Sequence, residues 1–292
     1  GSMVSEHFLT ANNIINILRQ VSINGVLAAG FTLVILIDGF DMSLGAIVSA
    51  CAVTAVVVLN STHSILLAVL SSLALGALFG IVNGTLIRIT KSDFSGSFLI
   101  TLGVSLVGFS VAYLVSGGYI MYVDRTLNQF RQIARGTTVL GLPNLFVIMI
   151  VVMAFFQLLL KKTTFGRNLY LVGSNKVAAY YTGINSHKVI ASSFLISGLC
   201  AGLAAIMMIS RTGGAGPTAG NMYEIDAAIV TIIGGNAAGR ASSSIIRTLI
   251  GVMIFGLISN IMNLMNFDST IEMIVKGVIL LIALYSNRSE GK

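Results

Sequence analysis

The sequence predicts an all-α integral membrane protein of about nine transmembrane helices, one of them short and broken. Of its 292 residues, 55% are hydrophobic and only 9% are charged, whereas a soluble domain carries about 25% charged residues. The charged residues separate apolar stretches close to the ~20 residues that a spanning helix needs. We expect a single transmembrane domain over residues 1–292.

The spans follow one another between these charges. The first lies between Arg19 and Asp38, and the uncharged stretch between Asp41 and Arg88 is long enough for two more. Further apolar stretches supply the rest. The expected full-length spans are 21–37, 42–59, 64–87, 96–115, 143–160, 188–210, 246–264 and 271–286.

The remaining helix, near 226–238, is too short to cross a membrane. Its uncharged stretch, 227–239, covers about 20 Å at ~1.5 Å per residue, against a hydrocarbon core of ~30 Å. It contains Gly234 and Gly235, with Glu224 and Asp226 expected at its outer mouth. We expect a broken or re-entrant helix, which requires surrounding protein or water and is common in transporters. DMSLGAIV (41–48) and DAAIVTII (226–233) suggest a weak inverted repeat.

Glycines recur every four residues within the third expected span. Gly76, Gly80 and Gly84 therefore share one smooth helix face, which favours close packing of two helices in a membrane. We expect this face to be architectural rather than a solute contact.

Basic residues predict the orientation of the chain. The net charge is +7, but the positive residues lie between apolar blocks rather than on one polar face, which argues against nucleic acid as a partner and favours topology signals. With the loop 161–187 in the cytoplasm, the inner segments carry Arg88, Lys91, Lys161, Lys162, Arg167, Lys176, Lys188, Arg240, Arg247, Arg288 and Lys292, and the outer segments carry Arg19, Arg125, Arg131, Arg135 and Arg211. Nine crossings then place the N-terminus outside, so we expect one further span upstream.

The sequence shows no catalytic, metal or cofactor site. A P-loop needs GxxxxGK[ST] to wrap phosphates, and no lysine here has that context; HExxH is also absent. Cys51 and Cys200 lie alone in apolar runs and are expected to be small buried hydrophobic residues. Energy for transport would have to come from a partner or an ion gradient.

The loop 161–187 is expected to contain a short helix. Ser174 or Asn175 suits its N-cap, and Gly183 suits the left-handed position after its end. Between them, Ala178 and Ala179 would form a small face for docking. An ordinary amphipathic loop helix is the alternative.

Four stretches resemble the ribose-type permeases of ABC importers, within the branched-chain amino acid and sugar permease superfamily. They are FLTANNIINILRQ (8–20), DGFDMSLG (38–45), TTFGRNLYLVGSNKVAAYYTGIN (163–185) and PTAGNMYEIDA (217–227) followed by Gly234 and Gly235. The resemblance runs in order over about residues 8–286. Members of this family usually have ten spans.

The resemblance implies a permease subunit in the bacterial inner membrane, importing a sugar or similar small polar solute. Its partners would be a second permease, separate ABC ATPase subunits and an extracytoplasmic solute-binding protein. The coupling helix would involve Gly173, Ser174, Asn175, Ala178, Ala179 and Gly183. Candidate pathway or gate residues are Asp38, Asp41, Ser43, Asn83, Glu224, Asp226, Gly234 and Gly235. The alternative for Asp41 and Asp226 is that they only cap helix N-termini.

The sequence also departs from the family pattern. Ser174 and Lys176 stand where the family has glycine and acidic residues, AGRASSS (238–244) replaces a glycine-rich turn, and Arg247 replaces a small residue. These departures favour a heterodimer with a more typical permease, although a homodimer stays open. Nucleosides or an amino acid are alternative solutes, and an ion-coupled secondary transporter or a channel is the alternative class.

Overall fold

The computed structural model describes residues 8–138, 141–240 and 243–289, and these form an all-α bundle with one minimal two-stranded sheet. The elements are α1 (Ala11–Leu36), α2 (Leu44–Thr62), α3 (Ile65–Thr90), α4 (Phe94–Ser116), β1 (Met121–Tyr122), α5 (Asn128–Arg135), α6 (Asn144–Lys162), α7 (Thr164–Ser174), α8 (Lys176–Tyr181), α9 (Ser186–Thr212), β2 (Gly214–Ala215), α10 (Tyr223–Ile233), α11 (Ile245–Leu264) and α12 (Ser269–Ser289). Lys292 and the loop residues 241–242 lie outside the described residues.

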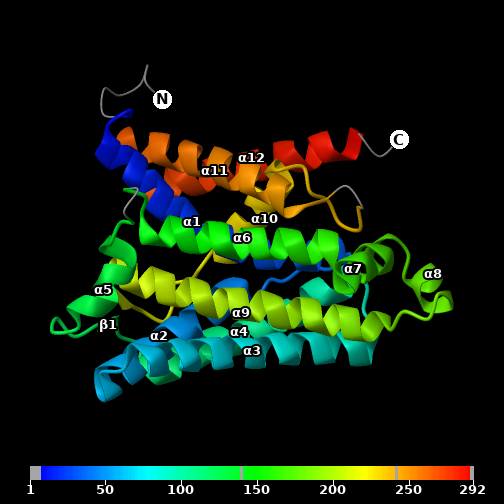
Figure 1. The fold of residues 1–292 in the computed structure, drawn as a ribbon, viewed down its shortest axis with the longest axis horizontal. Helices are drawn as coiled ribbons and strands as arrows, with labels where there is room; N and C mark the ends of the chain where they lie inside the picture. Colours follow the sequence, from blue (N-terminus) through cyan, green and yellow to red (C-terminus); the bar gives the residue numbers. More distant parts are fainter. Residues whose placement is uncertain (1–7, 139–140, 241–242, 290–292) are drawn as a thin grey trace.

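The long helices run roughly along one axis, and short elements cover the two ends (Figure 1). α5 and β1 lie at one end, with the start of α1; α7 and α8 lie at the other. We call the end with α5 the outer end and the end with α7 and α8 the inner end. These names follow the orientation predicted from the basic residues, which stays a prediction.

Seven of the described helices are long and apolar enough to cross a membrane: α1, α2, α3, α4, α6, α9 and α11. They confirm seven of the expected spans and the multi-pass membrane fold, but not the total of nine. α10 has 11 residues and is short, as expected. α12 has 21 residues and occupies the place of the last expected span.

α1 begins ten residues earlier than the sequence suggested. Thr10 caps it, because its hydroxyl accepts the N–H of Asn13. Arg19, taken as the boundary of the span, lies inside the helix and donates to the carbonyl oxygen of Arg135 over 2.9 Å. A long side chain near a helix end can reach polar partners at the membrane surface, so this arginine did not mark the end of the helix.

Burial divides the helices into a central and a peripheral set. α1, α2 and α9 are mostly buried, whereas α3, α4 and α6 expose much of their apolar surface. Leu78, Leu106 and Phe155, for example, are more than half exposed. In a chain with so few charges, such apolar faces suit lipid rather than water.

The glycines of α3 pack against α9, as predicted. A Cβ on Gly76 would overlap the carbonyl oxygen of Gly198, and one on Gly80 would lie 2.5 Å from that of Phe194. On Gly84 a Cβ would lie 2.8 Å from Cα of Ala191. The absence of side chains therefore permits backbone contact between these two spans.

Three short features were not anticipated: the amphipathic helix α5, the pairing of β1 with β2, and α7. α5 is fixed to α9 because Ser210 accepts the N–H of Ala134 and donates to the carbonyl of Phe130. α7 begins after Thr163, whose hydroxyl accepts the N–H of Gly166. The loop 161–187 thus holds two helices rather than one.

Candidate functional site

Two helices, α2 and α10, begin deep inside the bundle instead of at its ends. Asp41, just before α2, hydrogen-bonds Ser197, which lies 11 residues, or about 16 Å, along α9 from its inner start. Gly220, just before α10, donates to Ser49, which lies about 20 Å from the outer end of α2 by the same rise. The chain therefore crosses the inner half before α2, and the outer half before α10, without helix.

The starts of these two helices meet. A Cβ on Gly45 would overlap Oε2 of Glu224 and the carbonyl oxygen of Gly220. From this point α2 runs to the outer end and α10 to the inner end, as the weak inverted repeat suggested. The positive ends of two helix dipoles face one region, where acidic and polar groups are favoured.

A fully buried polar network surrounds the start of α2. The Asp41 carboxylate accepts the N–H of Ser43 at 3.0 Å, the hydroxyl of Ser43 at 2.6 Å and that of Ser197 at 3.0 Å. Asn83 of α3 donates to the Ser43 hydroxyl at 2.7 Å. Oδ1 of Asn83 has no hydrogen-bond partner among the described residues. Asp41 therefore joins the start of α2 to α9, and Ser43, the N-cap of α2, extends the network to α3.

The start of α10 carries two buried carboxylates with different surroundings. Oε2 of Glu224 has no hydrogen-bond partner among the described residues. Asp226 pairs with Lys276 of α12, whose Nζ lies 2.9 and 3.1 Å from its two oxygens. Lys276 also lies 3.4 Å from Glu272. Asp226 is thus not a cap, because the N-cap is Met222, and both carboxylates lie deep in the bundle rather than at an outer mouth.

The two glycines at the inner end of α10 have different constraints. A Cβ on Gly234 would overlap the carbonyl oxygen of Arg247, so backbone meets backbone there. Gly235 has space beside it but adopts φ +85°, which a side chain disfavours. Arg247 donates to the Gly235 carbonyl at 2.9 Å. Arg247 therefore supplies a donor to a carbonyl in the turn that follows α10.

α8 has the caps that the sequence suggested but a different exposed face. The Asn175 side chain accepts the N–H groups of Val177 and Ala178, both at 2.9 Å, and Gly183 has φ +80°. Ala178 is exposed, whereas Ala179 is 2% exposed and packs into its own chain. The exposed large side chains are Val177, Tyr180 and Tyr181. The pair of alanines therefore does not form one outward face.

α7 fixes α8 to the inner end of the core. A Cβ on Gly173 would overlap the carbonyl oxygen of Leu36, the last residue of α1. The Tyr170 hydroxyl donates to the carbonyl of Ser243 at 2.8 Å, in the loop that follows α10. The N–H of Gly239 in that loop donates to Ile35 at 3.1 Å. A displacement of α7 would therefore move or strain both the end of α1 and the segment after α10.

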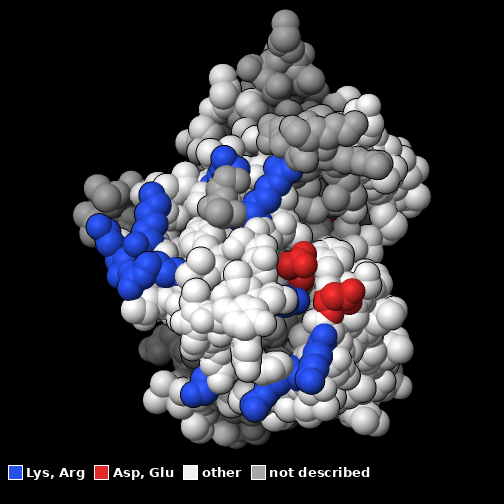
Figure 2. Space-filling model, turned by 90° about the vertical axis from the view of Figure 1, so that its right-hand side faces the viewer, with Lys and Arg blue, Asp and Glu red and all other residues white. Residues whose placement is uncertain are grey.

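The inner end is ringed by basic side chains. Figure 2 shows this end with Lys and Arg spread across it and acidic side chains nearer its middle. Asp38 lies on the loop after α1. Burial raises the pKa of its carboxyl group, and the opposing effect of the Lys176 charge is smaller. This distribution suits a face directed at the cytoplasm.

The structure groups some of the predicted site residues and separates others. Asp41, Ser43, Asn83 and Glu224 lie around the meeting point of α2 and α10, with Asp226 two residues further along α10. Gly234, Gly235 and Asp38 lie nearer the inner end. The predicted coupling residues lie in α7, in α8 and in the turns beside α8: Gly173, Ser174, Asn175, Ala178, Ala179 and Gly183.

Sequence reasoning missed three members of the site: Lys276, Glu272 and Ser197. Lys276 could have been singled out as a lysine within an apolar run, and Glu272 lies one turn before it; Ser197 carries no sequence signal. In the described part of the chain, no group of three or more His, Cys, Asp or Glu could hold a metal ion.

Comparison with known proteins identifies the family. The model of the family described as "Branched-chain amino acid transport system / permease component" matches residues 13–284. The ribose import permease protein RbsC of Escherichia coli K12 is 35% identical over 285 residues, covering 97% of this chain and 88% of that protein. RbsC of Haemophilus influenzae is 33% identical over 290 residues (99% and 89%). The D-allose transport system permease protein AlsC of E. coli K12 is 32% identical over 295 residues (100% and 88%).

No solved structure gives a significant match. The family match and these relatives cover nearly the whole chain, and its seven long apolar helices place it as a multi-pass protein of the bacterial inner membrane. The chain therefore belongs to the family of permease components of branched-chain amino acid transport systems, to which it is similar from its first described helix to its last.

Proposed function

We propose that this chain is the translocation subunit of an ATP-driven importer for a sugar. The observation that carries the proposal is a pair of buried oxygens, Oδ1 of Asn83 and Oε2 of Glu224, that have no donor among the described residues and flank the start of α2. A buried acceptor without a donor costs about 1–3 kcal/mol. A solute rich in hydroxyl groups would supply donors there, and similar permeases are named for ribose and D-allose.

Discontinuous helices support transport rather than a purely structural role. The non-helical segments before α2 and α10 place backbone and acidic groups at mid-depth, the arrangement that transporters use for solute sites. Motion at such a site needs an energy source, and the sequence has no nucleotide-binding loop of its own. ATP would be hydrolysed by a separate subunit.

α8 would be the contact for that ATPase. Its exposed apolar face of Val177, Tyr180 and Tyr181 lies at the inner end, 65–83% exposed, where large apolar side chains favour a protein interface. α7 would carry force from this face to α1 and the segment after α10, through Gly173 and Tyr170.

Two further surfaces suit the remaining partners. At the outer end, Arg125 and Arg135 are exposed and would attract acidic patches on a solute-binding protein. α12 packs mainly on α10 and exposes Ile274, Leu281 and other apolar side chains. That face would meet a second permease, either identical or related.

The test is solute uptake by cells that lack their own ribose and allose permeases. Cells that carry this chain with its neighbouring ATPase and binding protein should accumulate radiolabelled ribose or D-allose, and Glu224→Gln should weaken uptake. Asp124→Asn, in an exposed outer loop, is the matched control. Uptake of nucleosides or amino acids but no sugar would contradict the solute class. Uptake that survives loss of the ATPase and stops with a protonophore would indicate an ion-coupled transporter instead.

A further inference from the structure

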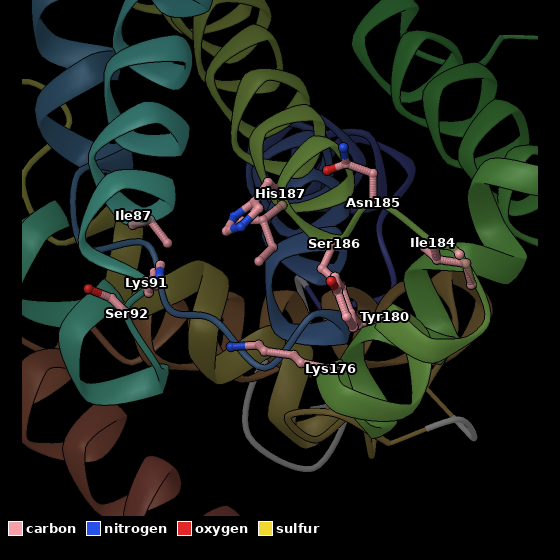
Figure 3. Close-up of a pocket in the computed structure, with 11 residues that line it drawn as sticks. Ile87, Lys91, Ser92, Lys176, Tyr180, Ile184, Asn185, Ser186 and His187 are labelled. Atoms are coloured by element: carbon pink, nitrogen blue, oxygen red, sulfur yellow. The ribbon is translucent and has the colours of Figure 1, made fainter.

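A hollow of about 440 Å³ lies at the inner end, between the end of α3 and the connection from α8 to α9 (Figure 3). This volume falls within the ~300–1,000 Å³ of small-molecule sites. The lining residues are Ile87, Lys91, Ser92, Lys176, Tyr180, Gly183, Ile184, Asn185, Ser186, His187 and Ile190. The transport pathway described above uses none of them.

The polar part of this lining is cationic and rich in donors. Lys91 follows α3, Lys176 opens α8, and His187 lies in the first turn of α9; Figure 3 shows them around one space. The start of the 27-residue helix α9 adds the positive end of its dipole. The buried Ser186 hydroxyl has no hydrogen-bond partner among the described residues. These features together suit a phosphate group.

Two acidic groups, Asp38 and Asp93, lie near this lining, but neither is part of it. The Asp93 carboxylate is engaged at the start of α4, where it accepts the N–H of Gly96 at 2.9 Å. Asp38 lies close enough to Lys176 for their charges to interact, but it is not part of the lining. An anion would therefore meet Lys91, Lys176, whose charge Asp38 partly offsets, and the polar ring of His187.

Apolar side chains border this site, and a separate apolar hollow lies on the next strip of α3. Ile87, Ile184 and Ile190 line the hollow beside its charges. On the neighbouring strip of α3, Leu86 and Thr90 line a second hollow of about 640 Å³ between α3 and α4. Apart from Thr90, that groove is lined by Leu, Ile, Val and Phe side chains and one glycine, so it suits a hydrocarbon chain.

We propose that these two hollows bind one anionic phospholipid of the inner leaflet, with its phosphate at Lys91, Lys176 and His187 and an acyl chain along α3 and α4. Basic pockets between membrane helices on the cytoplasmic side are known to favour anionic head groups. The ATPase is the less suitable occupant, because only Tyr180 of its expected contact face lines the hollow, whereas Val177 and Tyr181 do not. A bound lipid would hold α8 against α3 at the surface where the ATPase docks.

The test compares lipid retention by variants of the purified full-length chain. Wild type in detergent is incubated with equal amounts of phosphatidylglycerol and phosphatidylcholine, and bound lipid is counted by native mass spectrometry. Lys91→Gln combined with Lys176→Gln should reduce the preference for phosphatidylglycerol on the order of 25-fold, from about 5-fold per lysine. The matched control combines Lys161→Gln and Lys162→Gln, exposed lysines at the inner end of α6. It should keep the preference.

Conservative variants and competitors make the outcome decisive. Lys91→Arg combined with Lys176→Arg should retain phosphatidylglycerol, which separates charge from folding. Equal preference in both glutamine pairs, or no preference in wild type, would overturn the proposal. The glutamine variant of Lys91 and Lys176 is also tested for capture of the ATPase. If this variant captures less ATPase but retains as much lipid as wild type, the hollow belongs to the ATPase interface and the proposal is wrong. Displacement of the lipid by millimolar glycerol phosphate would identify a site for soluble phosphate esters.

Discussion

The ion pair between Lys276 and Asp226 gives the sharpest test of the site. It joins α12 to α10 through two Nζ–oxygen distances of 2.9 and 3.1 Å, and both side chains are largely buried, at 17% and 8% exposure. Removing one partner of a buried pair costs about 3–5 kcal/mol because a charge is left uncompensated. Glu272 lies 3.4 Å from Lys276 and some exposure remains, so we expect roughly 2–4 kcal/mol for Lys276→Met.

That loss should appear as a lower melting temperature in detergent. For a chain of this size, about 3 kcal/mol corresponds to roughly 5–10 °C. Asp226→Asn combined with Lys276→Met should recover most of it, because neither charge remains buried alone. Lys161→Met, at an exposed position, should melt like wild type. The reasoning would be refuted if Lys276→Met melted like wild type, or if the double variant were no more stable than the single one.

The other predictions concern the ends of the molecule and the glycines. Tyr181→Glu, 83% exposed on α8, should reduce capture of the ATPase at least tenfold at unchanged melting temperature; normal pull-down would remove α8 as the docking site. Gly235→Leu should reduce solute uptake severalfold through strain of ~1–3 kcal/mol at φ +85°, and Gly234→Leu should lower expression as well, because its side chain would meet backbone. Wild-type uptake by Gly235→Leu would show that this turn does not serve transport. A cysteine replacing Tyr181 should be labelled only from the cytoplasm, and one replacing Asn128 only from outside; the reverse pattern would invert the topology.

Several details of the site could not be predicted because they depend on partners distant in sequence. Asp226 looked like a helix cap, yet its partner is 50 residues away on α12. Ala178 and Ala179 looked like one small face, but packing of α8 turns Ala179 inward. Gly234 and Gly235 looked alike, although one lacks room for a side chain and the other needs a positive φ. A local sequence pattern cannot predict such contacts, because they form between residues that are far apart in the sequence.

The sequence by itself determined the membrane class, seven of the spans, the close glycine face of α3 and the caps of α8. These features follow from local composition and spacing: hydropathy selects a helix in lipid, and an N-cap joins residues two or three positions apart. Only the tertiary structure decided that α2 and α10 begin beside each other at mid-depth, that Asp41 and Ser43 link α2 to α9 and α3, and that Lys276 neutralises Asp226. Buried charges and broken helices are stable only through the particular groups that surround them, and the packing of the whole bundle selects those groups.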